Sequence, residues 1–104
     1  MEGEEYRLIL SRQAVKDLEQ LKRTELYDKA VAILEIIAVD PLRSPPPYKR
    51  LSGSLSHLYS RRINRTDRIV YGLIQPNLGD EDQRVIVHVK RVRSHYGGIV
   101  PILF

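Results

Sequence analysis

Two clusters of basic residues carry the side-chain types that RNA chemistry requires. The first cluster lies between Tyr48 and Arg68, where Asp67 is the only acid and the basic residues are Lys49, Arg50, Arg61, Arg62, Arg65 and Arg68. The second cluster is followed directly by a histidine and a tyrosine, and the run comprises Lys90, Arg91, Arg93, His95 and Tyr96. Guanidinium groups match phosphate oxygens, and tyrosine can stack on an unpaired base. The clusters predict an RNA-binding surface, and the alternative interpretation is a solvated basic face with surface ion pairs.

The same residue types could cleave RNA without a metal. In that reaction a base takes the proton of a ribose 2′-hydroxyl, cations stabilise the extra charge on the phosphate, and an acid protonates the departing 5′-oxygen. His95 is the natural acid, because an unperturbed imidazole has a pKa near neutrality. Arg62 and Arg68 are candidates for holding the phosphate. Tyr96 is a candidate for stacking, for orienting the substrate or for donating a proton.

Other chemistries lack the residues that they need. The sequence has no cluster of carboxylates for a two-metal nuclease, no glycine-rich phosphate loop, and no serine-hydrolase or dinucleotide-binding motif. Cysteine is absent, which excludes disulfides and thiolate zinc sites. The histidines His57, His88 and His95 are too dispersed to predict a zinc site. We therefore expect neither a metal nor a cofactor.

Composition predicts a single basic domain. The 104 residues fit one domain, spanning 1–104, and 42% hydrophobic residues suffice for one core. The net charge of +4 and a pI near 9.6 favour a polyanionic partner, usually nucleic acid. No apolar run approaches the roughly 20 residues of a membrane span, and the acidic N-terminus is unlike a secretory signal. A cytoplasmic location is the expectation.

Hydrophobic spacing predicts a strand and two helices in the first part of the chain. The strand spans Tyr6–Leu10, and Ser11 is a suitable N-cap for a helix that reaches Leu21. A second helix is predicted over Thr24–Val39, where the apolar residues form one stripe. Pro41 ends it, because the residue before a proline is pushed out of the helical region. The two helices should form a hairpin that packs on a sheet.

Three strands are predicted after a stiff connector of three prolines. They span Leu58–Asn64, Arg68–Gln75 and Arg84–Arg93, the last being rich in valine and isoleucine. The short loop at Asn64–Asp67 predicts a hairpin between the first two. The order of elements indicates an α+β domain, in which the three strands form an antiparallel meander that completes a four-stranded sheet beside the helical hairpin.

Strand alternation separates two neighbouring arginines. Tyr59, Arg61 and Ile63 share one face of their strand, and that face is the more apolar, so it should meet the helices. Arg62 should then point to the open face, and Arg61 must find a partner at the edge. For the last strand, the series containing Val87 and Arg91 alternates with the series containing His88 and Lys90, and the pattern leaves open which series is exposed.

Several segments together resemble the YoeB/Txe family within the RelE-like toxins. They are SRQAVKDLEQL near the start, PPYKRL after the prolines, then LSHLYSRRIN, DRIVY and RSHY. The resemblance covers nearly the whole chain and implies a RelE-like fold. It also implies a metal-independent endoribonuclease that acts on mRNA at the ribosome and is neutralised by a YefM/Phd-like antitoxin. The catalytic positions of the family fall on Arg62, Arg68, His95 and Tyr96, and a homodimer or a toxin–antitoxin hetero-oligomer is an expected assembly.

The chain departs from the family pattern at two places. Lys49 stands where the family usually has a glutamate that looks like the general base. A lysine can be that base only if burial or nearby positive charge lowers its pKa, and the alternative role is a phosphate clamp. The segment Gly97–Phe104 continues beyond the His-Tyr pair where family members typically end. Core or interface packing is the favoured role for this tail, because its large apolar side chains would be costly to expose.

Two other functions remain open on the sequence. One is a module that binds RNA or the ribosome but has lost cleavage through the change to Lys49. The other is a ParE-like toxin that binds gyrase, although ParE-like chains generally lack a terminal pair such as His95-Tyr96.

Overall fold

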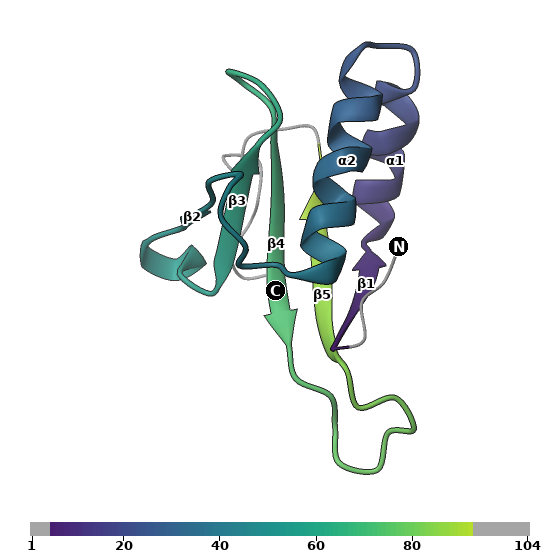
Figure 1. Ribbon diagram of the computed structural model, residues 1–104, viewed down its shortest axis with the longest axis vertical. Helices are drawn as coiled ribbons and strands as arrows, with labels where there is room; N and C mark the ends of the chain where they lie inside the picture. The colour runs from purple at the N-terminus through teal and green to yellow at the C-terminus, as the bar shows by residue number, and fades with distance from the viewer. Residues whose placement is uncertain (1–4, 93–104) are drawn as a thin grey trace.

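A computed structural model describes residues 5–92, in which two helices cover one face of a five-stranded sheet (Figure 1). The elements follow in the order β1 (Tyr6–Leu10), α1 (Arg12–Leu21), α2 (Leu26–Val39), β2 (Lys49–Arg50), a 3-10 turn (Gly53–Leu55), β3 (Leu58–Arg62), β4 (Arg68–Ile74) and β5 (Val85–Arg91). The predicted α+β class is confirmed. Within these residues, no helix is both long enough and apolar enough to span a bilayer.

The sheet has one strand more than the sequence predicts. Its order is β1-β5-β4-β3-β2, with β1 parallel to β5 and the other neighbours antiparallel. The predicted meander is β3-β4-β5. The expected count of four strands is wrong because Lys49 pairs with Ser60 and Arg50 pairs with Tyr59, which adds β2 at the edge. Two exposed basic residues show no hydrophobic alternation, so the pattern contained no sign of this strand.

Short polar contacts set the ends of the helices. The Ser11 hydroxyl accepts from the Ala14 amide at 3.0 Å, which confirms the predicted N-cap, and donates to the Lys90 carbonyl of β5 at 2.8 Å. The second helix begins later than predicted, because Thr24 belongs to the turn between the helices. Its hydroxyl donates to the Leu21 carbonyl at 2.8 Å and accepts from the Leu26 amide at 3.2 Å.

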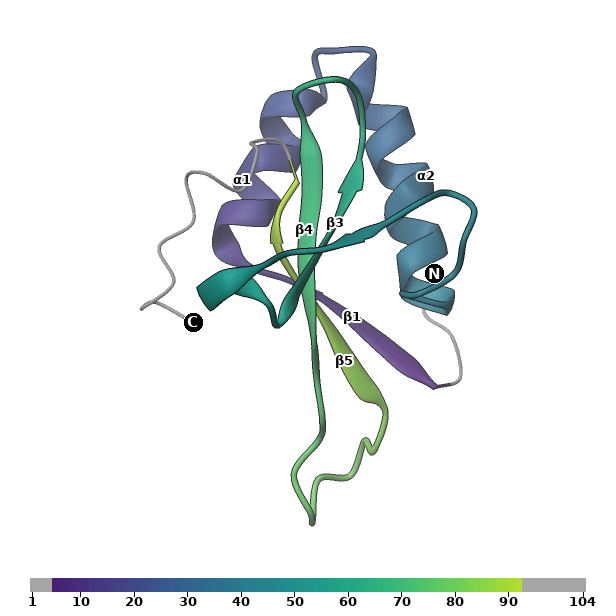
Figure 2. The ribbon, with the colours of Figure 1, turned by 90° about the vertical axis from the view of Figure 1, so that its left-hand side faces the viewer.

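The two faces of the sheet differ in what covers them. Both helices lie on the far side of β3 and β4 in Figure 2, while the chain around β2 crosses in front of these strands. The main core lies on the helix side and includes Ile37, Tyr71 and Val89, which are fully buried. On the open side, residues 5–92 form only a small cluster, from Leu51, Leu58 and Val70 with Leu55 beside them. Within these residues, neither helix covers the open face of the central strands.

The structure shows which face of the sheet the side chains of β3 and β5 occupy. The side chain of Arg61 is buried and that of Arg62 is exposed, as the alternation predicts. On β5, Val87 and Val89 are buried against the helices, so the series containing His88 and Lys90 lies on the open face.

Candidate nucleic-acid interface

A hollow of about 200 Å³ on the open face brings together three of the predicted site residues. Its lining comes from three adjacent strands and the segment before them, and consists of Pro47, Tyr48, Lys49, Ser60, Arg62 and Arg68. We call it the basic hollow. Sheet pairing creates it, because Lys49 lies opposite Ser60 and Arg62 lies opposite Arg68. Among residues 5–92, three cations and no carboxylate line this hollow, which is an electrostatic setting that suits a phosphate group.

The two arginines of the basic hollow differ in exposure. Arg62 is exposed, and within residues 5–92 its guanidinium has no hydrogen-bond partner. Arg68 is half-buried, and one of its terminal nitrogens donates to the Ser60 hydroxyl at 3.5 Å, a long contact. Ser60 is itself 1% exposed, so it supports the base of the hollow from below. A phosphate in this hollow would meet one exposed guanidinium and one that is partly held.

Lys49 is positioned through the tyrosine that precedes it. The Tyr48 ring contacts the Tyr59 ring edge-to-face with centroids 5.8 Å apart. The guanidinium carbon of Arg61 lies 5.1 Å from the centroid of the Tyr48 ring, within the range of a cation–π contact. Together with the pairing of Lys49 to Ser60, these contacts fix the backbone from which the exposed Lys49 side chain reaches into the hollow.

Arg61, one of the predicted RNA-binding residues, is buried on the helix side of the sheet and lies outside the basic hollow. Only 1% of it is exposed, and its guanidinium donates to the Tyr71 hydroxyl at 3.0 Å. The same group also donates to the carbonyls of Pro41, Arg43 and Pro46. These bonds attach the connector between α2 and β2 to the sheet. Burial and these four bonds therefore give Arg61 a structural role.

Arg91 is also withdrawn from the open face. It forms a salt bridge with Asp17 of α1, with its Nε 2.9 Å from the carboxylate, and Asp17 also accepts from the Val92 amide at 3.1 Å. Burial alone would raise the pKa of Asp17, but hydrogen bonds from Arg91, Gln13 and the Val92 amide together hold it below its usual value. The pair joins α1 to the end of β5. The guanidinium of Arg91 therefore faces the helix layer and not the basic hollow, and RNA binding by Arg91 stays a prediction.

The remaining predicted RNA-binding residues are distributed around the open face. Arg50 is exposed on β2 and donates to the Ser56 carbonyl at 2.6 Å. Arg65 is exposed in the loop between β3 and β4. Lys90 is half-buried on β5, and burial lowers its pKa. Arg93, His95 and Tyr96, as well as the tail Gly97–Phe104, lie outside the described residues.

Sequence reasoning missed three polar or aromatic residues near the site. Tyr48 and Ser60 line the basic hollow, and His88 lies beside Lys90 on the open face. Tyr48 directly precedes Lys49 in the sequence, which was a usable signal. Strand alternation put Ser60 on the face of Arg62 and His88 in the series of Lys90, but their neighbours across the sheet appear only when β3 and β5 are placed against β4.

No protein-family model matches the chain, and no curated protein shows a significant match to it. Solved structures do match over most of its length. A YoeB/ParE toxin from Agrobacterium tumefaciens aligns with a TM-score of 0.70 and 22% identity, covering 86% of this chain and 99% of the other. A chain of a heterotetrameric YoeB–YefM toxin–antitoxin complex from Staphylococcus aureus aligns with a TM-score of 0.64 and 23% identity, covering 88% of this chain and 98% of the other.

A third structure extends the likeness to another toxin. A chain of the DinJ–YafQ toxin–antitoxin complex from E. coli aligns with a TM-score of 0.64 and 16% identity, covering 92% of this chain and 99% of the other. The chain has the fold of the YoeB and YafQ toxins. This confirms at the level of the fold the resemblance to RelE-like toxins that the sequence motifs predicted.

Proposed function

We propose that this chain is the toxin of a type II toxin–antitoxin pair and that it cleaves mRNA at the ribosome without a metal. The observation that carries the proposal is the basic hollow, where Lys49, Arg62 and Arg68 meet on the open face with no carboxylate in the lining. The fold shared with YoeB and YafQ toxins supports the same function.

The proposed reaction is an internal attack within the RNA chain. A general base takes the proton of the ribose 2′-hydroxyl, the 2′-oxygen attacks the adjacent phosphorus, the bond from phosphorus to the 5′-oxygen breaks, and the products are a 2′,3′-cyclic phosphate and a 5′-hydroxyl. Arg62 and Arg68 stabilise the charge that accumulates on the phosphate oxygens. His95 gives a proton to the departing 5′-oxygen, and Tyr96 stacks on or orients the substrate. The sequence motif RSHY is the basis for these last two roles.

Two roles for Lys49 fit its place in the basic hollow. As a phosphate clamp it would act with its charge intact, and as a general base it would accept the proton of the 2′-hydroxyl. Its exposed position at β2 favours the clamp. In that case Lys49→Ala weakens cleavage by a similar factor across the pH range. If Lys49 is the base, the same substitution removes the rising limb of the pH–rate profile, and Lys49→Glu restores it at lower pH.

An acidic, YefM/Phd-like antitoxin is the expected partner, in addition to mRNA and the ribosome. The net charge of +4 and the exposed cations of the open face complement acidic side chains. Binding of such an antitoxin should weaken as salt is added, because salt screens exposed charges. Affinity that does not change with salt concentration would contradict this picture.

A translation-coupled cleavage assay tests the proposed function. The wild type should cut a reporter mRNA, and His95→Ala should cut it roughly 10²–10⁴-fold more slowly. Arg62→Met should lose roughly 10²–10³-fold, while the matched control Arg12→Met, an exposed arginine on α1, should behave as the wild type. If the wild type binds ribosomes but leaves the mRNA intact, the chain is a module that binds without cleaving. Inhibition of DNA gyrase in place of mRNA cleavage would favour the ParE-like alternative.

A further inference from the structure

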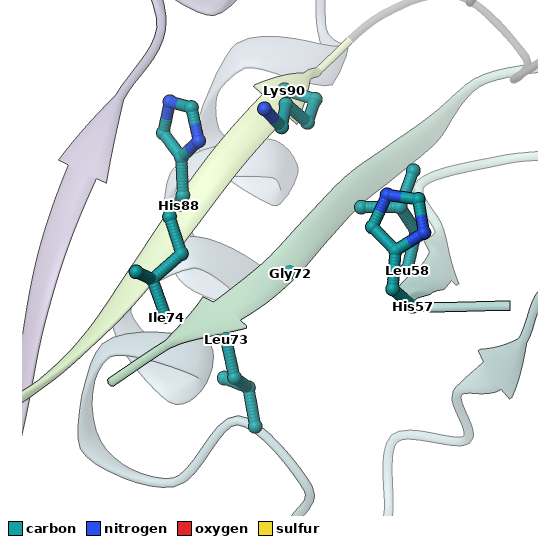
Figure 3. A pocket seen from close by; sticks show the side chains of 7 residues that line it. All are labelled: His57, Leu58, Gly72, Leu73, Ile74, His88 and Lys90. Carbon is teal, nitrogen blue, oxygen red and sulfur yellow. The ribbon is translucent and has the colours of Figure 1, made fainter. Parts of the chain in front are cut away.

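A second hollow on the open face is not used by the proposed reaction. It has a volume of about 410 Å³ and is lined mainly by His57, Leu58, Gly72, Ile74, His88 and Lys90. We call it the histidine hollow. Figure 3 shows His88 and Lys90 rising from β5 on one side of Gly72, and His57 with Leu58 on the other side. Its volume lies within the range of small-ligand pockets.

The absence of a side chain at Gly72 creates the histidine hollow. Leu58, Gly72 and His88 form one row across β3, β4 and β5, since Gly72 is the register partner of both Leu58 and His88. A Cβ atom at Gly72 would lie 3.1 Å from Leu58 Cδ2 and 3.5 Å from the His57 carbonyl oxygen. Any larger residue would therefore fill the middle of the row. The hollow exists because the central strand has a glycine between a leucine and a histidine.

The walls combine a flat imidazole surface, an apolar base and a cation. Burial lowers the pKa of His88, and the charge of Lys90 lowers it further, which favours a neutral ring with one donor and one acceptor nitrogen. Within residues 5–92, the buried Nδ1 of His88 has no hydrogen-bond partner. Leu58 and Ile74 supply the apolar part of the lining. This combination fits a planar, aromatic ligand with polar atoms at its edge.

We propose that the histidine hollow binds one unpaired nucleobase of the RNA whose neighbouring phosphate occupies the basic hollow. The inference rests on the proposed function. Leu58 of one hollow and Ser60 of the other are alternate residues on the same face of β3, which separates them by roughly 7 Å along the strand. A single RNA strand lying on the open face therefore meets both hollows. Unpaired bases are commonly held by stacking on aromatic rings, including imidazole, and by hydrogen bonds to their edges.

Lys90 in the lining should make the histidine hollow select between nucleobases. Guanine presents two adjacent acceptors, O6 and N7, to a lysine, whereas adenine presents N7 beside an amino group that is itself a donor. Lys90 should therefore favour guanine over adenine by roughly tenfold in cleavage efficiency. His57 contributes stacking surface at the rim, where it is exposed.

Reporter mRNAs that carry each of the four bases beside the cleaved position test the inference. Cleavage by the wild type should be fastest with guanine at one flanking position. Lys90→Met should abolish the preference for guanine over adenine, and His57→Ala and Gly72→Ala should slow cleavage at every base by roughly tenfold. Lys16→Met, an exposed lysine on α1, is the matched control and should change neither the rate nor the preference. Circular dichroism and the unfolding midpoint identify any variant that slows cleavage only because it is unfolded, and the exposed His57 keeps the test informative if Gly72→Ala does not fold.

The outcomes separate the inference from the proposed function. A wild type that cleaves with no dependence on flanking bases overturns the inference and leaves the ribonuclease in place. The same holds if Lys90→Met slows cleavage equally at all bases, since Lys90 would then contact only phosphate. Variants that cleave normally but bind the antitoxin more weakly would assign the histidine hollow to the antitoxin. No cleavage by the wild type would refute the proposed function itself.

Discussion

Arg61 and Arg62 are adjacent, chemically identical and placed on opposite faces of β3, so substitutions of the two make a matched experiment. Arg61 is 1% exposed and Arg62 is exposed to solvent. We predict that Arg61→Met destabilises the fold strongly and that Arg62→Met does not. The cleavage rate per folded molecule should show the opposite order. Arg62→Met should lower it more than Arg61→Met, because only Arg62 lines the basic hollow.

The magnitude follows from the hydrogen bonds that Arg61 makes. Its guanidinium donates to the Tyr71 hydroxyl and to three carbonyls of the connector, those of Pro41, Arg43 and Pro46. At about 1 kcal/mol net for each bond, the loss is about 4 kcal/mol. Two effects reduce it: the Tyr71 hydroxyl still donates to the Pro41 carbonyl at 2.6 Å, and the substitution removes a buried charge. We expect about 3 kcal/mol of lost stability for Arg61→Met.

Arg61→Lys should not restore the stability. A lysine keeps the buried charge but cannot reproduce the planar fork that reaches the tyrosine hydroxyl and the carbonyls together. The ring of Tyr48 would also lose the guanidinium that packs on it. Arg61→Lys should therefore be at least as unstable as Arg61→Met.

Urea unfolding provides the measurement. The free energies of unfolding come from midpoints and slopes, and the slopes should be unchanged if only the folded contacts are lost. Arg62→Met should stay within about 0.5 kcal/mol of the wild type, as surface substitutions usually do. Equal stability of the Arg61→Met and Arg62→Met variants would refute the argument that Arg61 holds the connector on the sheet.

Three further predictions concern the contacts that join the helices and the open face to β5. Ser11→Ala should cost about 1–2 kcal/mol, because it removes both the helix cap and the bond to the Lys90 carbonyl, whereas Ser11→Thr should retain most of the stability in urea unfolding. Asp17→Asn should cost about 2 kcal/mol at neutral pH and progressively less as the pH falls from about 3.8 through the lowered pKa of Asp17, because the contribution of the carboxylate is lost as acid protonates it in the fold; a stability that is equally pH-dependent in the variant would contradict this. The pKa of His88 lies below the usual 6.5, so the stability that the fold gains from its neutral imidazole is complete above that pH and is lost as the pH falls through the lowered pKa. Unfolding midpoints at about pH 7.5 and 5.5 should therefore differ less in His88→Gln than in the wild type, with His57→Gln as the control.

Local sequence signals predicted most of the fold because they depend on contacts between near neighbours. The cap at Ser11 needs only the first turn of a helix, and the hairpin between β3 and β4 needs only the short loop at Asn64–Asp67. That loop is held by the Asn64 side chain, which accepts from the Thr66 and Asp67 amides at 2.9 and 2.7 Å. The second helix began two residues later than predicted because the Thr24 hydroxyl bonds to the end of the first.

The site could be predicted only in part. Alternation along one strand predicted that Arg62 points to the open face, and the DRIVY motif supplied Arg68 as its companion. The clustering of positive charge in the sequence also placed Arg61 and Arg91 among the predicted RNA-binding residues. Their partners, the connector carbonyls for Arg61 and Asp17 for Arg91, lie far away in the chain, so no local pattern could have revealed them.

By itself, the sequence determined the order of the elements, the basic character of the molecule and the facing of the two arginines on β3. These features depend on composition, on hydrophobic period and on the strict alternation of side chains along a strand. The tertiary structure alone decided that Lys49 pairs with Ser60, that Gly72 opens a hollow between Leu58 and His88, and that Arg91 turns to the helices. Each of these depends on which strands become neighbours, and that is settled by packing the whole sheet against α1 and α2.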